Sequence, residues 1–102
     1  MPSIAQLEKL LAANPNDAFL LYGMAQEHAK SGNHALAIEW YDRCLKADPG
    51  YCYAYFHKAR TQADAGKTAD AVATLKAGAA AAKRACDAHA ASEIAAYLDE
   101  LT

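Results

Sequence analysis

Apolar side chains recur at spacings of three and four residues over most of this 102-residue chain, which is the pattern of amphipathic helices. The clearest case lies between two helix breakers, Gly32 and Pro49. Its apolar positions are Ala37, Ile38, Tyr41, Cys44 and Leu45. A single helix cannot bury such a stripe by itself, so we expect other helices to pack on both sides of this segment.

The same pattern predicts helices before and after this segment. One begins after Ser3 and ends before Asn14, and two more cover about 18–30 and 51–64. A fifth begins near Thr68 and, because neither Gly nor Pro follows Gly78, is expected to extend to about residue 88. A last amphipathic segment covers 92–101, with Ser92 as a candidate cap. Whether this segment continues the fifth helix or bends away from it stays open.

Breakers and small residues repeat along the chain with one period. Five pairs of positions lie 34 residues apart: Pro15 and Pro49, Gly32 and Gly66, Ala25 and Ala59, Ala37 and Ala71, and Tyr41 and Leu75. A fixed period of this length indicates an array of structural repeats, each of them one supersecondary unit. We therefore expect a short helical array with a single modest core.

These residues resemble the tetratricopeptide repeat, a helix-turn-helix unit with small residues at the helix crossing and a proline after the second helix. The resemblance implies an all-α fold in which antiparallel helix-turn-helix repeats stack as a short right-handed solenoid with a C-terminal capping helix. It implies a single domain over 1–102. The parts of this domain would be a half repeat at 3–15, a first repeat at 18–51, a second repeat at 52–85 and the capping helix at 86–102.

Three positions depart from the pattern of the family. Lys58 replaces an expected large apolar residue, and His28 and Gln62 replace an expected aromatic residue. We therefore expect this layer of the core to be loose or partly solvated, with the methylene stem of Lys58 able to lie on the core.

The resemblance also implies a function, because the first helices of successive repeats in this family line a concave groove for a peptide or a partner's helix. The chain would then be a non-catalytic protein-protein interaction module or scaffold. The groove positions carried over from the family are Phe19, Tyr22, Gln26 and Lys30 in the first repeat, and Tyr53, Phe56, His57, Arg60 and Asp64 in the second. Aromatic side chains beside Lys30 and Arg60 would suit an apolar anchor next to a carboxylate or a main-chain carbonyl.

The chaperone-binding members of the family hold a terminal carboxylate with Lys, Arg and Asn at defined groove positions. Here Tyr22 and Gln26 stand where that clamp would need Lys and Asn. The sequence therefore does not support binding of a chaperone tail.

Other interpretations stay open at this stage. The groove aromatics could pack on one another or beneath the C-terminal segment, which would leave no open groove. The chain could also be a self-assembly module in which the long C-terminal helices form a homodimer. The seam of that dimer would be Val72, Leu75, Ala79, Ala82 and Cys86. A remote alternative is a small enzyme that uses Cys52, since a thiol near a helix N-terminus can have a depressed pKa.

The composition narrows the remaining classes of function. A formal net charge of −2 argues against nucleic acid, which usually demands a basic face. Three cysteines without paired spacing predict neither a disulfide framework nor a zinc site, and we expect no other metal and no cofactor. Neither a signal peptide nor a spanning helix is readable near the N-terminus, so we expect a cytoplasmic protein without membrane insertion.

Overall fold

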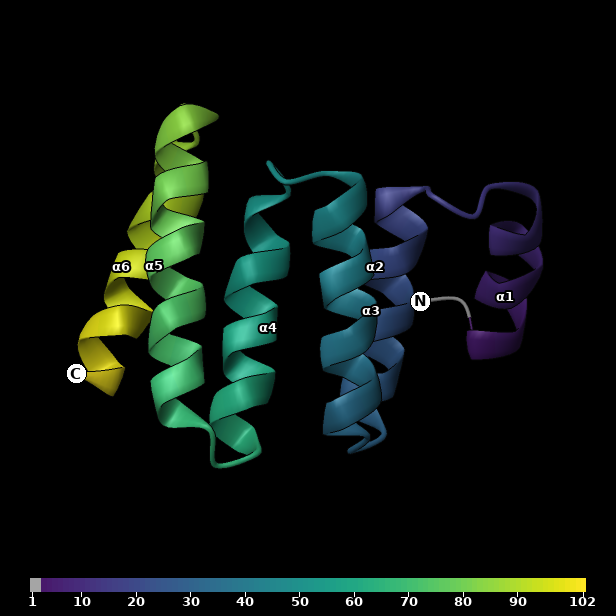
Figure 1. Cartoon of the computed structure of the whole chain (residues 1–102), viewed down its shortest axis with the longest axis horizontal. Helices are drawn as coiled ribbons and strands as arrows, with labels where there is room; N and C mark the ends of the chain where they lie inside the picture. The colour runs from purple at the N-terminus through teal and green to yellow at the C-terminus, as the bar shows by residue number, and fades with distance from the viewer. Residues whose placement is uncertain (1–2) are drawn as a thin grey trace.

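The computed structural model describes residues 3–102, and these residues form six helices and no strand (Figure 1). The helices are α1 (Ile4–Ala13), α2 (Ala18–Lys30), α3 (His34–Ala47), α4 (Cys52–Asp64), α5 (Thr68–Arg84) and α6 (Ala88–Leu101). From α2 onward, consecutive helices run antiparallel and lie side by side. This is the all-α helical repeat fold that the sequence predicted.

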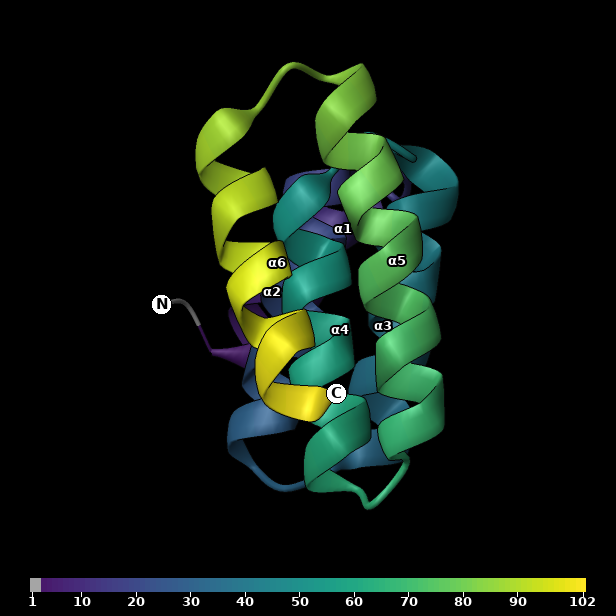
Figure 2. The same ribbon diagram turned by 90° about the vertical axis from the view of Figure 1, so that its left-hand side faces the viewer.

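The helices of the two hairpins, α2 with α3 and α4 with α5, form two layers. Figure 1 shows α3 and α5 in front of α2 and α6, and the turned view in Figure 2 separates the same two pairs. The last helix, α6, contacts both α4 and α5, just as α4 contacts both α2 and α3. Thus α6 stands where the first helix of a further hairpin would stand, next to α4.

The turns inside the two hairpins are built by glycine. Gly32 and Gly66 both have a φ of +81°, a left-handed conformation that a residue without a β-carbon adopts at little cost. In each turn the amide after the glycine donates to the carbonyl five residues earlier, at 3.0 Å after α2 and 2.8 Å after α4. The glycines therefore end α2 and α4 at the residues where the sequence predicted these ends.

The boundary between α5 and α6 differs from the prediction. The fifth helix ends at Arg84, not near residue 88, and α6 begins at Ala88 with Asp87 as its cap, not with Ser92. The reason is Cys86, which has a φ of 56° and so lies in the same left-handed region as the two glycines. A residue with a β-carbon rarely adopts this conformation, so the sequence contains no breaker that marks the turn.

Small residues set the spacing inside each hairpin. The four alanines that the period singled out are fully buried: Ala25, Ala37, Ala59 and Ala71. In the second hairpin the helices also approach at Gly78, where an added β-carbon would lie 2.6 Å from the β-carbon of Tyr55. A larger side chain at these positions would push the two helices apart.

The layer around Lys58 and Gln62 is tighter than the sequence suggested. The side chain of Lys58 is only 20% exposed and forms an ion pair with Asp42 of α3, so its stem does cover the core. Gln62 is 8% exposed, and its side-chain oxygen accepts a hydrogen bond of 2.6 Å from the hydroxyl of Thr74 on α5. The expectation of a partly solvated layer was therefore wrong for Gln62, which finds its partner inside the protein.

Candidate partner-binding groove

Three adjoining hollows lie along the layer formed by α2, α4 and α6. The first, of about 220 Å³, is lined by Phe19, Tyr22, Gly23, Gln26 and Lys30. The second, of about 240 Å³, is lined by Gln26, Ala29, Lys30, Tyr41, His57, Arg60, Thr61 and Asp64. The third, of about 500 Å³, is lined by Phe56, Arg60, Asp64, Glu93, Ala96, Tyr97 and Glu100. Because each hollow shares residues with the next, the three form one surface, which we call the groove.

Eight of the nine residues that the resemblance assigned to a groove line these hollows. The exception is Tyr53, whose ring lies against His89 of α6 with the ring centroids 6.4 Å apart. Since α6 stands beside α4, Tyr53 packs at the base of that helix pair and does not border a hollow.

The part of the groove on α2 combines one free aromatic ring with one fixed ring. Phe19 is 67% exposed, so its ring is available for contact. Tyr22 packs against Tyr51, with centroids 5.0 Å apart, and against Tyr41, with centroids 6.0 Å apart. Burial, followed by the nearby Tyr51, raises the pKa of Tyr22 to about 12, so its hydroxyl stays neutral at pH 7.

A short hydrogen-bonded chain holds the floor of the groove. The amide nitrogen of Gln26 donates to the Tyr22 hydroxyl at 2.7 Å, and the Tyr41 hydroxyl donates to the amide oxygen of Gln26 at 3.1 Å. Tyr41 is fully buried and belongs to α3, the second helix of the hairpin. The sequence prediction did not include Tyr41, because it was read there as a core position.

The part of the groove on α4 is built around Phe56 and His57. Their rings meet edge to face with centroids 5.2 Å apart, and His57 also meets Tyr22 of α2 at 5.8 Å. The guanidinium of Arg60 lies 6.0 Å from the centre of the Phe56 ring. Burial, followed by the positive charge of Arg60, lowers the pKa of His57, so the imidazole is neutral at pH 7.

The last helix forms a wall of the groove, which the sequence reasoning missed. Tyr97 of α6 packs against Phe56 with ring centroids 5.6 Å apart. Glu93 and Glu100 line the hollow opposite Arg60 and therefore bring negative charge to this side. Spacings of three and four from Glu93 to Ala96, Tyr97 and Glu100 mark this face of α6 in the sequence. The C-terminal segment thus borders the groove and leaves the three hollows described above.

Charge changes sign along the groove. Lys30 and Arg60 stand at the middle hollow, and Lys30 also contacts Glu27 at 3.3 Å. Asp64, Glu93 and Glu100 line the hollow at α6, while the hollow at Phe19 contains no acidic residue. A bound chain would therefore meet an apolar end, a cationic centre and an acidic end.

The environment of Cys52 contradicts the idea of an activated thiol. Cys52 is 5% exposed, and its sulfur donates to the carbonyl of Gly50 at 3.3 Å. Burial, followed by the carboxylate of Asp87, raises the pKa of the Cys52 thiol, so the predicted depression is wrong. The enzyme interpretation that rested on this thiol loses its nucleophile.

The seam proposed for a homodimer through the fifth helix is used inside the chain. Leu75 and Ala82 are buried in the core shared with α4 and α6. Cys86 lies beyond the end of α5, in the turn. The seam therefore faces this chain's own helices and does not present a continuous stripe to a second copy.

The described residues offer two further negative findings. Between residues 3 and 102, no three His, Cys, Asp or Glu side chains are grouped as a metal ion would require. Within the same range, no helix has both the length and the apolar character needed to cross a membrane.

Comparison with known proteins places the repeats in a family. The model of the tetratricopeptide repeat matches residues 20–51. A TPR repeat-containing protein of Pseudomonas aeruginosa is 30% identical over 98 residues, which cover 96% of this chain and 93% of that protein. Two solved structures are also similar. A tetratricopeptide repeat domain protein from Salinibacter ruber has 28% identity and a TM-score of 0.79, over 85% of this chain and 88% of its own.

The second structure is the TPR2B domain of yeast Sti1 in a complex with pHsp70. It has 23% identity and a TM-score of 0.89, over 96% of this chain and 78% of its own, and so shows the shared fold. The identity and the coverage of the Pseudomonas aeruginosa relative, together with the repeat match, carry the assignment. The chain belongs to the tetratricopeptide repeat family.

Proposed function

We propose that this chain is a non-catalytic protein interaction module that binds an extended peptide or a partner's helix in the groove across α2, α4 and α6. The observation that carries the proposal is the continuity of the three hollows, which share Gln26 and Lys30 at one junction and Arg60 and Asp64 at the other. A surface that crosses three helices can contact a peptide over several residues, which a single small pocket cannot.

The chemistry of the groove supports a partner with an apolar anchor and charged neighbours. Phe19 and the edge of Tyr22 offer an apolar contact at one end of the groove. Lys30 and Arg60 would pair with a carboxylate or main-chain carbonyls, while Glu93 would pair with a basic side chain. The neutral His57 between them can donate or accept one hydrogen bond.

Other features support the same kind of module. The fold neighbour from yeast was solved in a complex with pHsp70, and proteins of this family are generally interaction modules without catalysis. We assign the hairpins to repeats at 18–51 and 52–85, with a half repeat at 3–15 and a cap at 86–102. The three cysteines are free thiols, which is compatible with a reducing cytoplasm.

A selection from a random peptide library on the immobilised chain would test the proposal. The test variant is Phe19→Ser with Arg60→Glu, because both side chains are exposed and neither fills the core. We avoid Tyr22, since its packing against Tyr41 and Tyr51 makes it part of the fold. We expect the variant to lose at least about tenfold in affinity for the selected peptides, with unchanged helicity.

The matched control is Leu36→Ser with Lys76→Glu, which makes the same kinds of change on the outer helices α3 and α5. Leu36 is 43% exposed and Lys76 is exposed, and neither lines the groove. The control should bind the selected peptides as the native chain does. Equal binding by the groove variant, or an equal loss in the control, would refute a groove-bound partner.

A further inference from the structure

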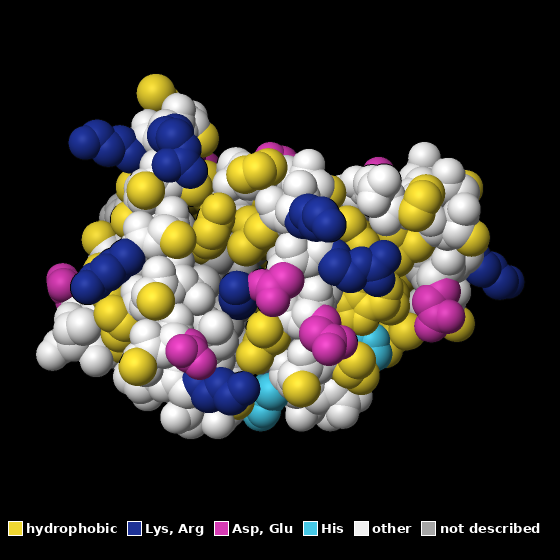
Figure 3. All heavy atoms as spheres, viewed as in Figure 1, with side chains coloured by type: hydrophobic (Ala, Val, Ile, Leu, Met, Phe, Trp, Pro, Cys, Tyr) yellow, Lys and Arg dark blue, Asp and Glu magenta, His cyan; other side chains and the backbone are white. Residues whose placement is uncertain are grey.

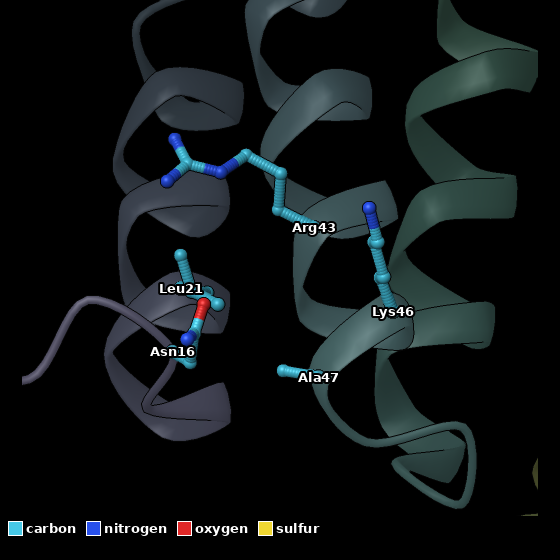
Figure 4. Close-up of a pocket in the computed structure, with 5 residues that line it drawn as sticks. All are labelled: Asn16, Leu21, Arg43, Lys46 and Ala47. Carbon is cyan, nitrogen blue, oxygen red and sulfur yellow. The ribbon is translucent and has the colours of Figure 1, made fainter.

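A separate hollow lies between α2 and α3 and shares no residue with the groove. It measures about 490 Å³ and is lined by Asn16, Leu21, Arg43, Lys46 and Ala47. Figure 4 shows Arg43 reaching from α3 toward α2, above Leu21 and Asn16, with Ala47 pointing into the lower end. The hollow therefore combines an apolar wall with a cationic edge.

The guanidinium of Arg43 is held in place by an aromatic ring. Its central carbon lies 4.2 Å from the centre of the Trp40 ring. The indole of Trp40 in turn lies parallel to the His28 ring of α2, at 5° between the planes and 6.4 Å between the centroids. A guanidinium that rests on an aromatic face keeps the N–H groups of its edge free to donate.

The two cations at this hollow have no countercharge of their own. Among residues 3–102, the ion pairs involve other cationic residues and leave out both Arg43 and Lys46. None of the five lining residues is acidic. Since positions three apart on a helix are neighbours, two like charges stand side by side, and an anion between them would be favourable. Figure 3 shows neighbouring Lys and Arg side chains on this face, beside an apolar area.

We propose that this hollow is a second binding site, which takes a peptide carboxylate with an aliphatic side chain next to it. Arg43 would hold the carboxylate with two parallel hydrogen bonds, and Lys46 would add a second positive charge. Leu21 and Ala47 would cover the aliphatic side chain, and the amide of Asn16 would bond the peptide main chain. The carboxylate can come from a chain terminus or from a glutamate side chain, and the probes below distinguish these sources.

Three short peptides serve as probes. The first is acetyl-Gly-Gly-Leu with a free terminal carboxylate, the second is its terminal amide, and the third is acetyl-Gly-Glu-Leu amide. Trp40 is the only tryptophan of the chain and contacts Arg43, so its emission reports on this hollow directly. Calorimetry on the native chain, Arg43→Gln and the control Arg84→Gln gives the affinities. Arg84 is an exposed cation at the far end of α5 and is absent from the hollow.

We expect a saturable change of Trp40 emission with the first or the third peptide and none with the neutral amide. A response to the first alone identifies a chain terminus, and a response to the third alone identifies a glutamate side chain. The affinity should fall about tenfold in Arg43→Gln and stay unchanged in Arg84→Gln.

Three results would overturn the proposal. The neutral amide could bind as well as the carboxylate peptides, the two arginine variants could lose affinity equally, or no peptide could bind at millimolar concentration. Inorganic phosphate that binds as tightly as the peptides would also overturn it, since the site would then recognise charge alone.

Discussion

The two hairpins of this protein have the same backbone arrangement but join their helices with different chemistry. In the first hairpin the rings of His28 and Trp40 lie parallel, with centroids 6.4 Å apart. In the second hairpin, 34 residues later, the hydroxyl of Thr74 donates to the amide oxygen of Gln62 at 2.6 Å. Both pairs connect the first helix of a hairpin to its second. The comparison teaches that this position requires a filled volume and a direct contact between the helices, and that more than one pair of residues meets that requirement.

The same comparison explains the floor of the groove. Tyr41 in the first hairpin and Leu75 in the second are equivalent and both fully buried, but only Tyr41 carries a hydroxyl that reaches Gln26. The groove side of the first hairpin is therefore held by a polar chain, while the second hairpin is apolar at this depth. Changes in one hairpin should accordingly have effects that the equivalent changes in the other do not.

The largest difference is expected at Gly78, which is equivalent to Cys44. A β-carbon at Gly78 would lie 2.6 Å from that of Tyr55, which cannot move without its backbone. Gly78→Val should lower the free energy of unfolding by about 3 kcal/mol through overpacking, whereas Cys44→Val should cost under about 1.5 kcal/mol. Urea unfolding followed by circular dichroism measures both. Equal losses at the two positions would show that the hairpins are not packed differently here.

The next effect concerns the hydrogen bond of the second hairpin. Thr74→Val removes the donor and leaves the buried oxygen of Gln62 without its partner, which should cost about 1.5 kcal/mol. The matched control is Thr61→Val, because the hydroxyl of Thr61 bonds only the His57 carbonyl of its own helix. An unfolding midpoint in urea that moves no further for Thr74→Val than for Thr61→Val would contradict the role assigned to this bond.

A smaller effect is expected at the polar floor of the first hairpin. Tyr41→Phe keeps the ring but removes the hydrogen bond of 3.1 Å to Gln26, at a cost of about 1 kcal/mol. The side-chain amide signals of Gln26 in an NMR spectrum should shift in the same variant. If neither stability nor these signals change, the polar chain does not hold the groove floor.

The smallest effect is expected at Lys58, which is equivalent to Met24. Lys58→Met would make the second hairpin resemble the first and exchange an ion pair with a half-exposed Asp42 for apolar contact. Because such pairs add little, the free energy of unfolding should change by less than about 0.5 kcal/mol. A destabilisation well beyond this, seen in the same urea experiment, would mean that the ion pair is needed to join α3 to α4.

The sequence predicted the parts of this fold that breakers and small residues mark. Gly32, Gly66 and Pro49 set the ends of the hairpin helices, because glycine adopts the left-handed turn and proline cannot continue a helix. The end of α5 escaped prediction because Cys86, a residue with a β-carbon, makes that turn. Conformations that a side chain disfavours leave no signal in the pattern of apolar residues.

The groove could be predicted only as far as the period holds. The start of α4 follows the start of α2 by 34 residues, whereas α6 follows α4 by 36, since α5 has 17 residues and α3 has 14. Groove positions on α2 and α4 therefore carried over in phase, while Glu93, Tyr97 and Glu100 on α6 did not. Tyr53 was assigned to the groove on the same phase, but its contact with His89 depends on where α6 lies.

The most direct test of the groove is an NMR titration of the labelled chain with a peptide from the library selection. The account predicts that amide signals shift along one face of α2, α4 and α6 together, including those of Phe19, Arg60 and Tyr97. Shifts confined to the outer helices α3 and α5, with the signals of these three residues unchanged, would contradict it.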